Sequence, residues 1–156
     1  FLTSSTHNGN FGGLGLQGAD DICRDLANAA SLGGTWLAWL STSTANAKDR
    51  VLPGDAKYVR TDGELIANNK ADLLDGSIAI RIYRDENNNE VFNAPLTVWT
   101  GTDENGNNAT DTCNNWTDAF SDGTIGSGVF TDSRWTYGTI TVSCSSPLRR
   151  LYCFEQ

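Results

Sequence analysis

The sequence predicts an α+β fold with one main N-terminal helix, a mixed but mostly antiparallel sheet and long loops. Three features indicate this class: one clear amphipathic helix, several short apolar segments bounded by turn residues, and long polar loops. The 156 residues match the size of one domain, and an aromatic content of 10% separates the chain from disordered proteins. We therefore expect residues 1–156 to form a single domain.

The main helix is expected from Gly18 to about Ala30. Its apolar residues recur at steps of three and four, which places them on one face: Ala19, Ile22, Cys23, Leu26 and Ala30. Asp20 and Asp21 are expected in the first turn, where the helix dipole favours negative charge. Gly33-Gly34 is expected to end the helix, because glycine readily adopts the left-handed conformation found there.

Short elements are expected in the middle of the chain. Residues 36–40 (WLAWL) form an aromatic-rich apolar run that predicts a buried strand or the strand-like entry to a loop. Pro53-Gly54 predicts a turn. Residues 58–59 and 65–66 flank an Asp-Gly turn signal and predict a small hairpin, and residues 68–74 are expected to form a short helix.

A strand, a turn and a second strand are expected next. In residues 78–83 (IAIRIY) the isoleucines alternate with other side chains, which predicts a half-buried strand. The polar run DENNNE at 85–90 predicts a turn. Residues 91–101 are expected to continue as a strand or sheet edge, with a break at Pro95, because proline cannot donate to a sheet ladder.

The last third of the chain is expected to be a long loop followed by two strands. Residues 102–133 are dominated by Asp, Asn, Gly, Ser and Thr, and long irregular segments of this kind are usually functional. Residues 139–144 and 149–155 are expected to form neighbouring strands. These strands would carry Cys144 and Cys153.

Composition and charge exclude two classes of partner. The net charge of −8 and the pI of about 4.4 oppose phosphate binding, so we expect no nucleic-acid partner. No apolar run reaches the ~20 residues of a membrane helix, so we expect no direct membrane insertion. The sequence begins at Phe1 and contains no Met, so we expect a processed product or a domain excised from a longer protein.

The four cysteines indicate an oxidising compartment. Cys23, Cys113, Cys144 and Cys153 lack the close C-x₂-C spacing of structural zinc sites. Four cysteines allow three disulfide connectivities, and the spacing leaves all three open. Two disulfides would form outside the reducing cytoplasm, so we expect an extracellular or cell-surface location.

No residue pattern predicts catalysis. His7 is the single histidine, and nothing in the sequence marks the partners that would complete a Ser-His-Asp triad. Cysteines paired in disulfides cannot act as nucleophiles. No carboxylate pair stands out among the nineteen acidic residues. We therefore expect a binding protein rather than an enzyme.

Four segments of the chain resemble endostatin, the C-terminal fragment of a collagen, and still more the bacterial endostatin-like surface domains. The segments are GADDIC, SLGGTWLAWLS, VWTGTDENGNNATDTCNNW, and SC followed by LYCFE. This resemblance implies a C-type-lectin-like fold and two nested disulfides, Cys23–Cys153 and Cys113–Cys144. The histidine zinc ligands and the arginine-rich heparin surface of endostatin have no counterpart here, so neither zinc nor heparin binding is implied.

The same family relationship suggests a calcium site at Asp103, Asn105 and Asp111. Sugar-binding C-type lectins carry a Glu-Pro-Asn tripeptide and a later acid at similar places before the corresponding cysteine, and oxygen ligands of this kind suit Ca²⁺. The match is partial, because the proline is absent and Trp135-Thr136-Tyr137 stands where the lectins have Trp-Asn-Asp. The alternative interpretation is that Asn105-Gly106 simply makes a turn.

Candidate ligand-binding residues lie in the loop region from about Thr100 to Trp135, with the 84–90 turn beside it. Trp135 is expected to offer an aromatic ring to a partner, whereas the other four tryptophans are expected in the core. The complete set of candidates is Asp103, Asn105, Asn107, Asn108, Asp118, Asp132 and Trp135.

The resemblance implies adhesion as the function. We expect an extracellular domain that recognises a protein or glycan ligand on another cell or on the matrix through these loops. A calcium-dependent carbohydrate-binding lectin is one alternative. The other is a structural module of a surface fibre, which would form a homo-oligomer through the parent protein.

Overall fold

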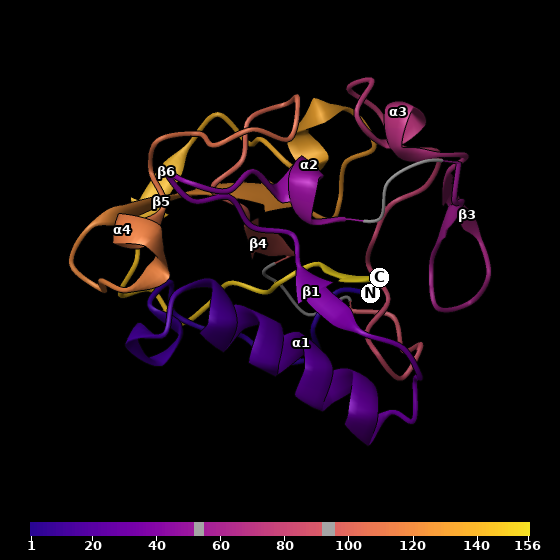
Figure 1. Ribbon diagram of the computed structural model, residues 1–156, viewed down its shortest axis with the longest axis horizontal. Helices are drawn as coiled ribbons and strands as arrows, with labels where there is room; N and C mark the ends of the chain where they lie inside the picture. The colour runs from indigo at the N-terminus through magenta and orange to yellow at the C-terminus, as the bar shows by residue number, and fades with distance from the viewer. Residues whose placement is uncertain (52–54, 92–95) are drawn as a thin grey trace.

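A computed structural model describes residues 1–51, 55–91 and 96–156, and it shows one long helix packed beside three small antiparallel sheets (Figure 1). The α+β class is therefore confirmed, although the expected single sheet is divided into three. The turn expected at Pro53-Gly54 and the break expected at Pro95 lie outside the described residues. In chain order the elements are η1 (Phe11–Gly13), α1 (Leu16–Ala29), β1 (Trp36–Ala38), α2 (Ala47–Arg50), β2 (Tyr58–Val59), β3 (Leu65–Ala67), α3 (Lys70–Leu73), β4 (Thr97–Trp99), α4 (Cys113–Trp116), β5 (Asp122–Ser127), η2 (Ser133–Trp135), β6 (Thr141–Ser143) and β7 (Cys153–Glu155).

Helix α1 confirms the main predicted helix, with corrected ends. It begins two residues early, so the aspartates at 20 and 21 fall outside its first turn. It also ends before Gly33-Gly34. The left-handed residue after its last turn is Ser31, with φ of 58°. The Leu32 amide donates to the Ala27 carbonyl at 2.9 Å and the Ser31 amide to the Asn28 carbonyl at 3.0 Å, a hydrogen-bond pair that closes a helix without glycine.

Helix α1 is tied to the sheet formed by β1 and β7. The two strands pair antiparallel, with Ala38 opposite Cys153, so the first three residues of the 36–40 run form a strand and the last two lead into the following loop. Asp20 accepts a hydrogen bond from the Ala38 amide at 2.9 Å and also binds the guanidinium of Arg50. The Cys23–Cys153 disulfide adds a covalent link between α1 and β7. Both predicted disulfides are present in the structure.

Strands β6 and β7 are not neighbours, contrary to the prediction for residues 139–144 and 149–155. Strand β6 pairs with β5, whereas β7 pairs with β1. Cys144 directly follows β6 and Cys153 is the first residue of β7, so the two cysteines belong to different sheets. The antiparallel hairpin of β2 and β3 and the short helix α3 agree with the predictions for their segments.

The prediction of a strand at residues 78–83 is wrong. Ile78 and Ile82 are buried as expected, but the segment forms no ladder. The Ile78 amide donates to the Thr131 carbonyl at 2.7 Å, and the next amide, of Ala79, donates to the Ile66 carbonyl at 2.8 Å. The segment therefore forms hydrogen bonds to two separate parts of the chain. The alternating isoleucines indicate that one face of the segment is buried, but they do not show that the segment pairs with a neighbouring strand.

Strand β5 lies inside the region predicted to be a long loop. It is the longest strand and the centre of the β4-β5-β6 sheet. Its glycines explain why the sequence does not look like a strand. A Cβ atom on Gly123 would lie 2.7 Å from the Cys113 sulfur, and one on Gly126 would lie 2.2 Å from the Trp135 carbonyl oxygen. Close backbone packing therefore replaces the usual alternation of side chains.

Two clusters of aromatic side chains fill the interior. The first contains Trp39, Trp135 and Tyr152, and the second contains Trp99 and Trp116 near the disulfides. The rings of Trp39 and Trp135 have centroids 5.2 Å apart, a separation typical of favourable aromatic pairs. Within the described ranges, no helix combines the length and the apolar character needed to cross a membrane.

The β2–β3 hairpin is fixed to the body of the protein by arginines. The Arg60 guanidinium donates to both carboxylate oxygens of Asp62, at 2.9 and 2.5 Å, and its Nη1 donates to the Arg81 carbonyl at 3.0 Å. Arg84 Nε lies 2.8 Å from the same Asp62 carboxylate. The Arg60 hydrogen bonds, helped by the backbone amide of Glu64 and by Arg84, lower the pKa of Asp62 to about 2.

We predict that Asp62→Asn reduces stability at neutral pH but not at strongly acidic pH. The folded pKa of Asp62 lies below its ordinary value of 3.8, so the stability it contributes is complete above about pH 4 and is lost as pH falls toward 2. The variant should lose ~1 kcal/mol of unfolding free energy at pH 7 and much less near pH 2, measured by urea denaturation.

Glu64→Gln provides the control for this prediction, because Glu64 is exposed and forms no ion pair among the described residues. Its effect should stay small at both pH values. An Asp62→Asn penalty that is the same at pH 7 and near pH 2 would contradict the assigned role of the ion pairs.

Candidate functional site

Among the described residues, the most unusual backbone is the left-handed turn of α4. Its four residues, Cys113 to Trp116, have φ values of 53°, 51°, 58° and 66°. The Trp116 amide donates to the Thr112 carbonyl at 2.7 Å, and the Thr117 amide donates to the Cys113 carbonyl at 3.1 Å. Element α4 is therefore one turn of left-handed helix, a conformation that L-residues visit singly rather than in series.

Several contacts hold this turn in place. An ordinary residue pays about 1–2 kcal/mol in the left-handed region, although asparagine tolerates it better. The Asn115 side chain accepts a hydrogen bond from the Ser43 amide at 2.8 Å. The buried Trp116 indole donates to the Ser41 carbonyl at 2.7 Å. Cys113 is fully buried in its disulfide with Cys144. Strain that is maintained by so many contacts is a common mark of a functional site.

The turn belongs to a segment, residues 110–122, that we call the 110–122 loop. Its carboxylates, hydroxyls and amides surround a shallow depression beside the turn, together with Ser43 from the loop after β1. The residues that line this depression are Ser43, Thr110, Asp111, Thr112, Asn114, Asn115, Ser121 and Asp122. The surface is polar and carries two carboxylates, so it can accept hydrogen bonds from hydroxyl and amide groups of a ligand.

Phe120 projects from the same loop. Its side chain is 96% exposed, whereas the other exposed large apolar side chains of the described residues reach at most 62%. The Asp118 carboxylate accepts a hydrogen bond from the Phe120 amide at 2.8 Å, which fixes the backbone beneath the ring. The loop thus combines one apolar side chain in water with a polar surround.

Asp103 and Asn105, two of the predicted calcium ligands, form a self-contained turn. One Asp103 carboxylate oxygen accepts from the amides of Asn105 and Asn107, at 2.9 and 2.8 Å. The other oxygen accepts from the Asn107 side chain at 3.2 Å. Gly106 takes the left-handed position, with φ of 78°. The interpretation of this stretch as a turn is therefore confirmed.

The chain makes the same turn a second time at Asp85. Its carboxylate accepts from the amides of Asn87 and Asn89, at 2.9 and 2.8 Å, and from the Asn89 side chain at 3.3 Å. Asn88 takes the left-handed position, with φ of 63°. The two stretches share the pattern D-E-N-x-N, so this pattern encodes a hairpin loop.

The structure does not gather the three predicted calcium ligands into one carboxylate-rich site. Asp111 lies at the depression of the 110–122 loop, whereas the Asp103 oxygens are occupied by their own loop. Among the residues that the structure describes, no group of three or more His, Cys, Asp or Glu side chains is placed to hold a metal ion. The donor set therefore offers Ca²⁺ fewer carboxylates than its usual sites provide.

Trp135 is not an exposed ligand-binding aromatic, and this prediction is wrong. The residue is 1% exposed, because its ring packs between Trp39 and Tyr152, so it cannot stack on a ligand. Asp132 is exposed but caps η2 and pairs with Arg134. Asn108 accepts from the Thr110 amide at 3.2 Å at the edge of the 110–122 loop. Two of the predicted site residues, Asp111 and Asp118, lie within that loop.

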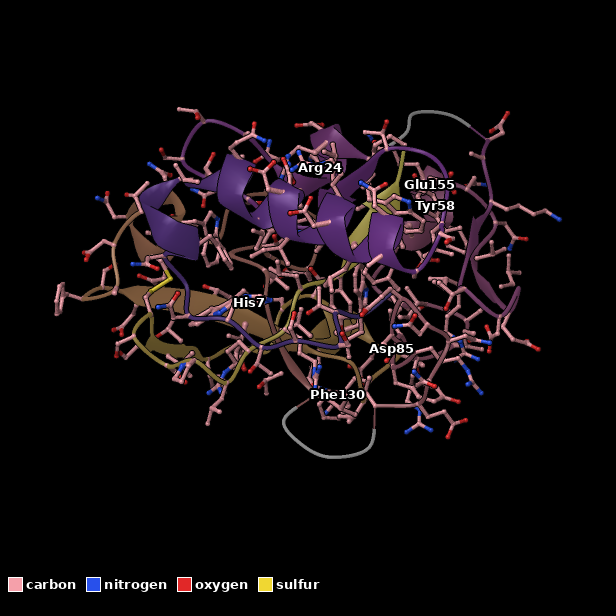
Figure 2. All side chains as sticks on the ribbon, turned by 90° about the horizontal axis from the view of Figure 1, so that it is seen from below. His7, Arg24, Tyr58, Asp85, Phe130 and Glu155 are labelled. Atoms are coloured by element: carbon pink, nitrogen blue, oxygen red, sulfur yellow. A yellow bond between two sulfur atoms is a disulfide. The ribbon has the colours of Figure 1, made fainter. Side chains whose placement is uncertain are left out.

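The single histidine has a structural environment. His7 Nε2 lies 2.8 Å from the Ser5 hydroxyl, and the His7 carbonyl accepts from the Trp99 indole at 3.0 Å. Burial, and secondly the positive charge of Arg150, lower the pKa of His7. Figure 2 shows the residue on the N-terminal segment, on the side of the molecule away from the outer face of α1.

The sequence contained signals for the residues that were missed. Asn114-Asn115 directly after a cysteine is a pair that tolerates the left-handed region. Phe120 is the one large apolar residue in the run from Thr117 to Gly123. Neither signal states that the backbone turns left-handed or that the ring faces water, because both depend on contacts with distant parts of the chain.

A family model described as "Protein of unknown function (DUF1554)" matches residues 4–132. The match includes α1, both D-E-N-x-N turns and the 110–122 loop, and it ends before β6 and β7. No curated protein matches the chain. The description of the family names neither a ligand nor a reaction, so functional assignment depends on the geometry described above.

We predict that Asn114→Gly leaves the unfolding free energy nearly unchanged, whereas Asn114→Val lowers it by about 1–2 kcal/mol. Asn114 is exposed, so the difference reports the left-handed backbone rather than burial. Urea denaturation provides the measurement. Asn28→Val on the exposed face of α1 is the control and should cost no more than ~0.7 kcal/mol. Equal costs at both sites would contradict the left-handed turn.

We further predict that Asp103→Ala lowers the unfolding free energy by about 1–2 kcal/mol, because three donors lose their acceptor. Asp85→Ala should cost more, since Asp85 is only 6% exposed. Glu104→Ala, at the exposed neighbouring position, is the control. Millimolar Ca²⁺ should leave the melting temperature unchanged. A rise in the wild type that Asp103→Ala abolishes would show that the turn binds calcium after all.

Proposed function

The chain belongs to the DUF1554 family, and we propose that it is an extracellular binding domain whose 110–122 loop recognises a protein or glycan ligand. The observation that carries the proposal is the 96% exposure of Phe120 on a segment whose backbone is otherwise firmly held. The resemblance to endostatin-like surface domains supports the same function, and the two disulfides are compatible with a location outside the cell.

The apolar side chain supplies a source of affinity. Burying a phenylalanine that is fully exposed in the free protein contributes about 1.5–3 kcal/mol. Aromatic side chains that a partner surrounds completely are the typical hot spots of binding surfaces. Around Phe120, the polar groups of Asp118 and Asp122 can satisfy a ligand's hydrogen-bond donors, in the way that a polar rim does.

The fixed backbone supplies a second advantage. A loop that is already ordered loses little conformational entropy when a ligand binds. The Cys113–Cys144 disulfide, the buried Trp116 indole and the Asn115–Ser43 hydrogen bond order this loop before binding. We propose binding rather than catalysis because an ordered loop with an exposed aromatic side chain favours recognition of a ligand surface.

We propose a C-type-lectin-like arrangement for the fold. It is supported by the nesting of the two disulfides, with Cys113–Cys144 inside Cys23–Cys153, and by the pairing of β1 with the C-terminal β7. In this arrangement a scaffold that brings the two ends of the chain together displays the long segment between β4 and β6. The 110–122 loop is part of that displayed segment.

We predict that Phe120→Ser weakens ligand binding about tenfold or more, because it removes the apolar anchor without changing the core. The measurement is binding of purified domain to an array that carries matrix glycoproteins beside free glycans. Val59→Ser is the matched control, because Val59 is also exposed, at 55%, and lies on the hairpin at the end of the molecule opposite α4 (Figure 1). It should leave binding unchanged.

Two results would overturn the proposal. One is binding that survives Phe120→Ser at full strength. The other is a wild-type dimer, seen by sedimentation, that dissociates in Phe120→Ser, because the ring would then contact a second copy of the chain and the domain would act as an assembly module.

A further inference from the structure

A groove lined by arginines lies between the β2–β3 hairpin, residues 79–84 and residues 129–131. Its volume of about 590 Å³ is within the range of small-ligand sites. Three guanidinium groups gather around the ring of Tyr83, with Arg60, Arg81 and Arg84 at 4.7, 5.2 and 5.7 Å from its centroid. Arg81 and Arg84 are close in the sequence, but nothing in the sequence indicates that Arg60 joins them.

Two of the three guanidinium groups are already neutralised by the protein. Arg60 donates to both oxygens of Asp62, and Arg84 pairs with Asp62 and, at 2.8 Å, with Glu90. These pairs fix the positions of both side chains. They also show that the groove suits the bidentate contact between an arginine and a carboxylate.

Arg81 differs from its two neighbours. Its side chain is exposed and forms no ion pair or hydrogen bond with any residue in the described part of the chain. Its backbone is nevertheless fixed, because its carbonyl accepts from Arg60 at 3.0 Å and the next side chain, Ile82, is buried. The structure thus holds one guanidinium beside an aromatic ring with its donors open to a ligand.

The charge of the surroundings restricts the ligand. Asp62 and Glu90 balance the charges of Arg60 and Arg84, so Arg81 and Glu64 are the two charges lining the groove that have no ion-pair partner among the described residues. The whole protein carries −8. A polyanion would be repelled by Glu64 and by the rest of the surface, whereas a ligand with one negative charge can contact the unpaired guanidinium of Arg81 without that penalty.

We propose that this groove binds a single carboxylate side chain of an extended peptide segment, through a bidentate contact with Arg81. The planar guanidinium presents two parallel N–H donors that match the two oxygens of a carboxylate. Val129, which is 40% exposed, lines the groove and offers apolar contact to the rest of the peptide. The site shares no residue with the 110–122 loop, so it stands or falls independently of the proposed function.

The test uses the whole domain and the peptide acetyl-Gly-Val-Glu-Val-Gly-amide as probe, because its valines can make the proposed apolar contact with Val129. Two-dimensional ¹H–¹⁵N NMR should show saturable shifts of the Arg81 Nε–H signal and of the amides of residues 79–84 and 129–131. The matching peptide with glutamine in place of glutamate should bind at least fivefold more weakly. Glucuronate offers the same carboxylate on a sugar and should bind more weakly than the glutamate peptide.

Variants of the groove separate the role of Arg81 from folding. Arg81→Gln should abolish the shifts, and Arg81→Lys, which keeps the charge but loses the fork, should weaken binding several-fold. Glu64→Gln should strengthen it about two- to threefold by removing a like charge. Arg24→Gln is the control, because Arg24 is an exposed arginine on the outer face of α1 (Figure 2).

Three results would overturn the proposal. They are unchanged binding in Arg81→Gln, equal binding of the glutamate and glutamine peptides, and tighter binding of glucuronate or of a heparin fragment than of the glutamate peptide. The last result would assign the groove to a carbohydrate.

Discussion

The Cys113–Cys144 disulfide is the constraint on which the rest of this end of the molecule depends. Its sulfur atoms lie between two backbones that approach too closely for any side chain. A Cβ on Gly9 would lie 2.3 Å from the Cys113 sulfur, and one on Gly123 would lie 2.7 Å from it. The N-terminal segment and β5 therefore both pack directly on the crosslink, and the left-handed turn that follows Thr112 starts from a fixed point.

The elements that the sequence predicted well are those specified by local pattern. The spacing of apolar residues located α1, and the Asp-Gly turn located the β2–β3 hairpin. Strand β5 escaped prediction because its packing depends on glycines against distant backbone, and residues 78–83 were misassigned because alternating burial does not require a ladder. Both disulfide pairs followed from family resemblance, since the spacing of the cysteines permits three pairings.

In the candidate site too, features set by local sequence were predicted and features set by distant contacts were missed. Asp118 was predicted from its place in the loop region, but Trp135 was misassigned because its neighbours in sequence are polar while its ring packs against Trp39 in the core. Phe120 has the reverse character, an aromatic side chain that the fold leaves in water. The arginine groove was also hidden, since it joins the β2–β3 hairpin to residues about twenty and seventy positions later.

The Asp-centred turn forms twice in this chain, in two different surroundings. One copy, at Asp85, is buried and the other, at Asp103, is half-exposed, yet their hydrogen bonds correspond one to one. The conformation of the turn is therefore determined mainly by its own five residues and depends little on the residues packed around it. The pentapeptide therefore forms the same tight reversal of the chain in two different surroundings.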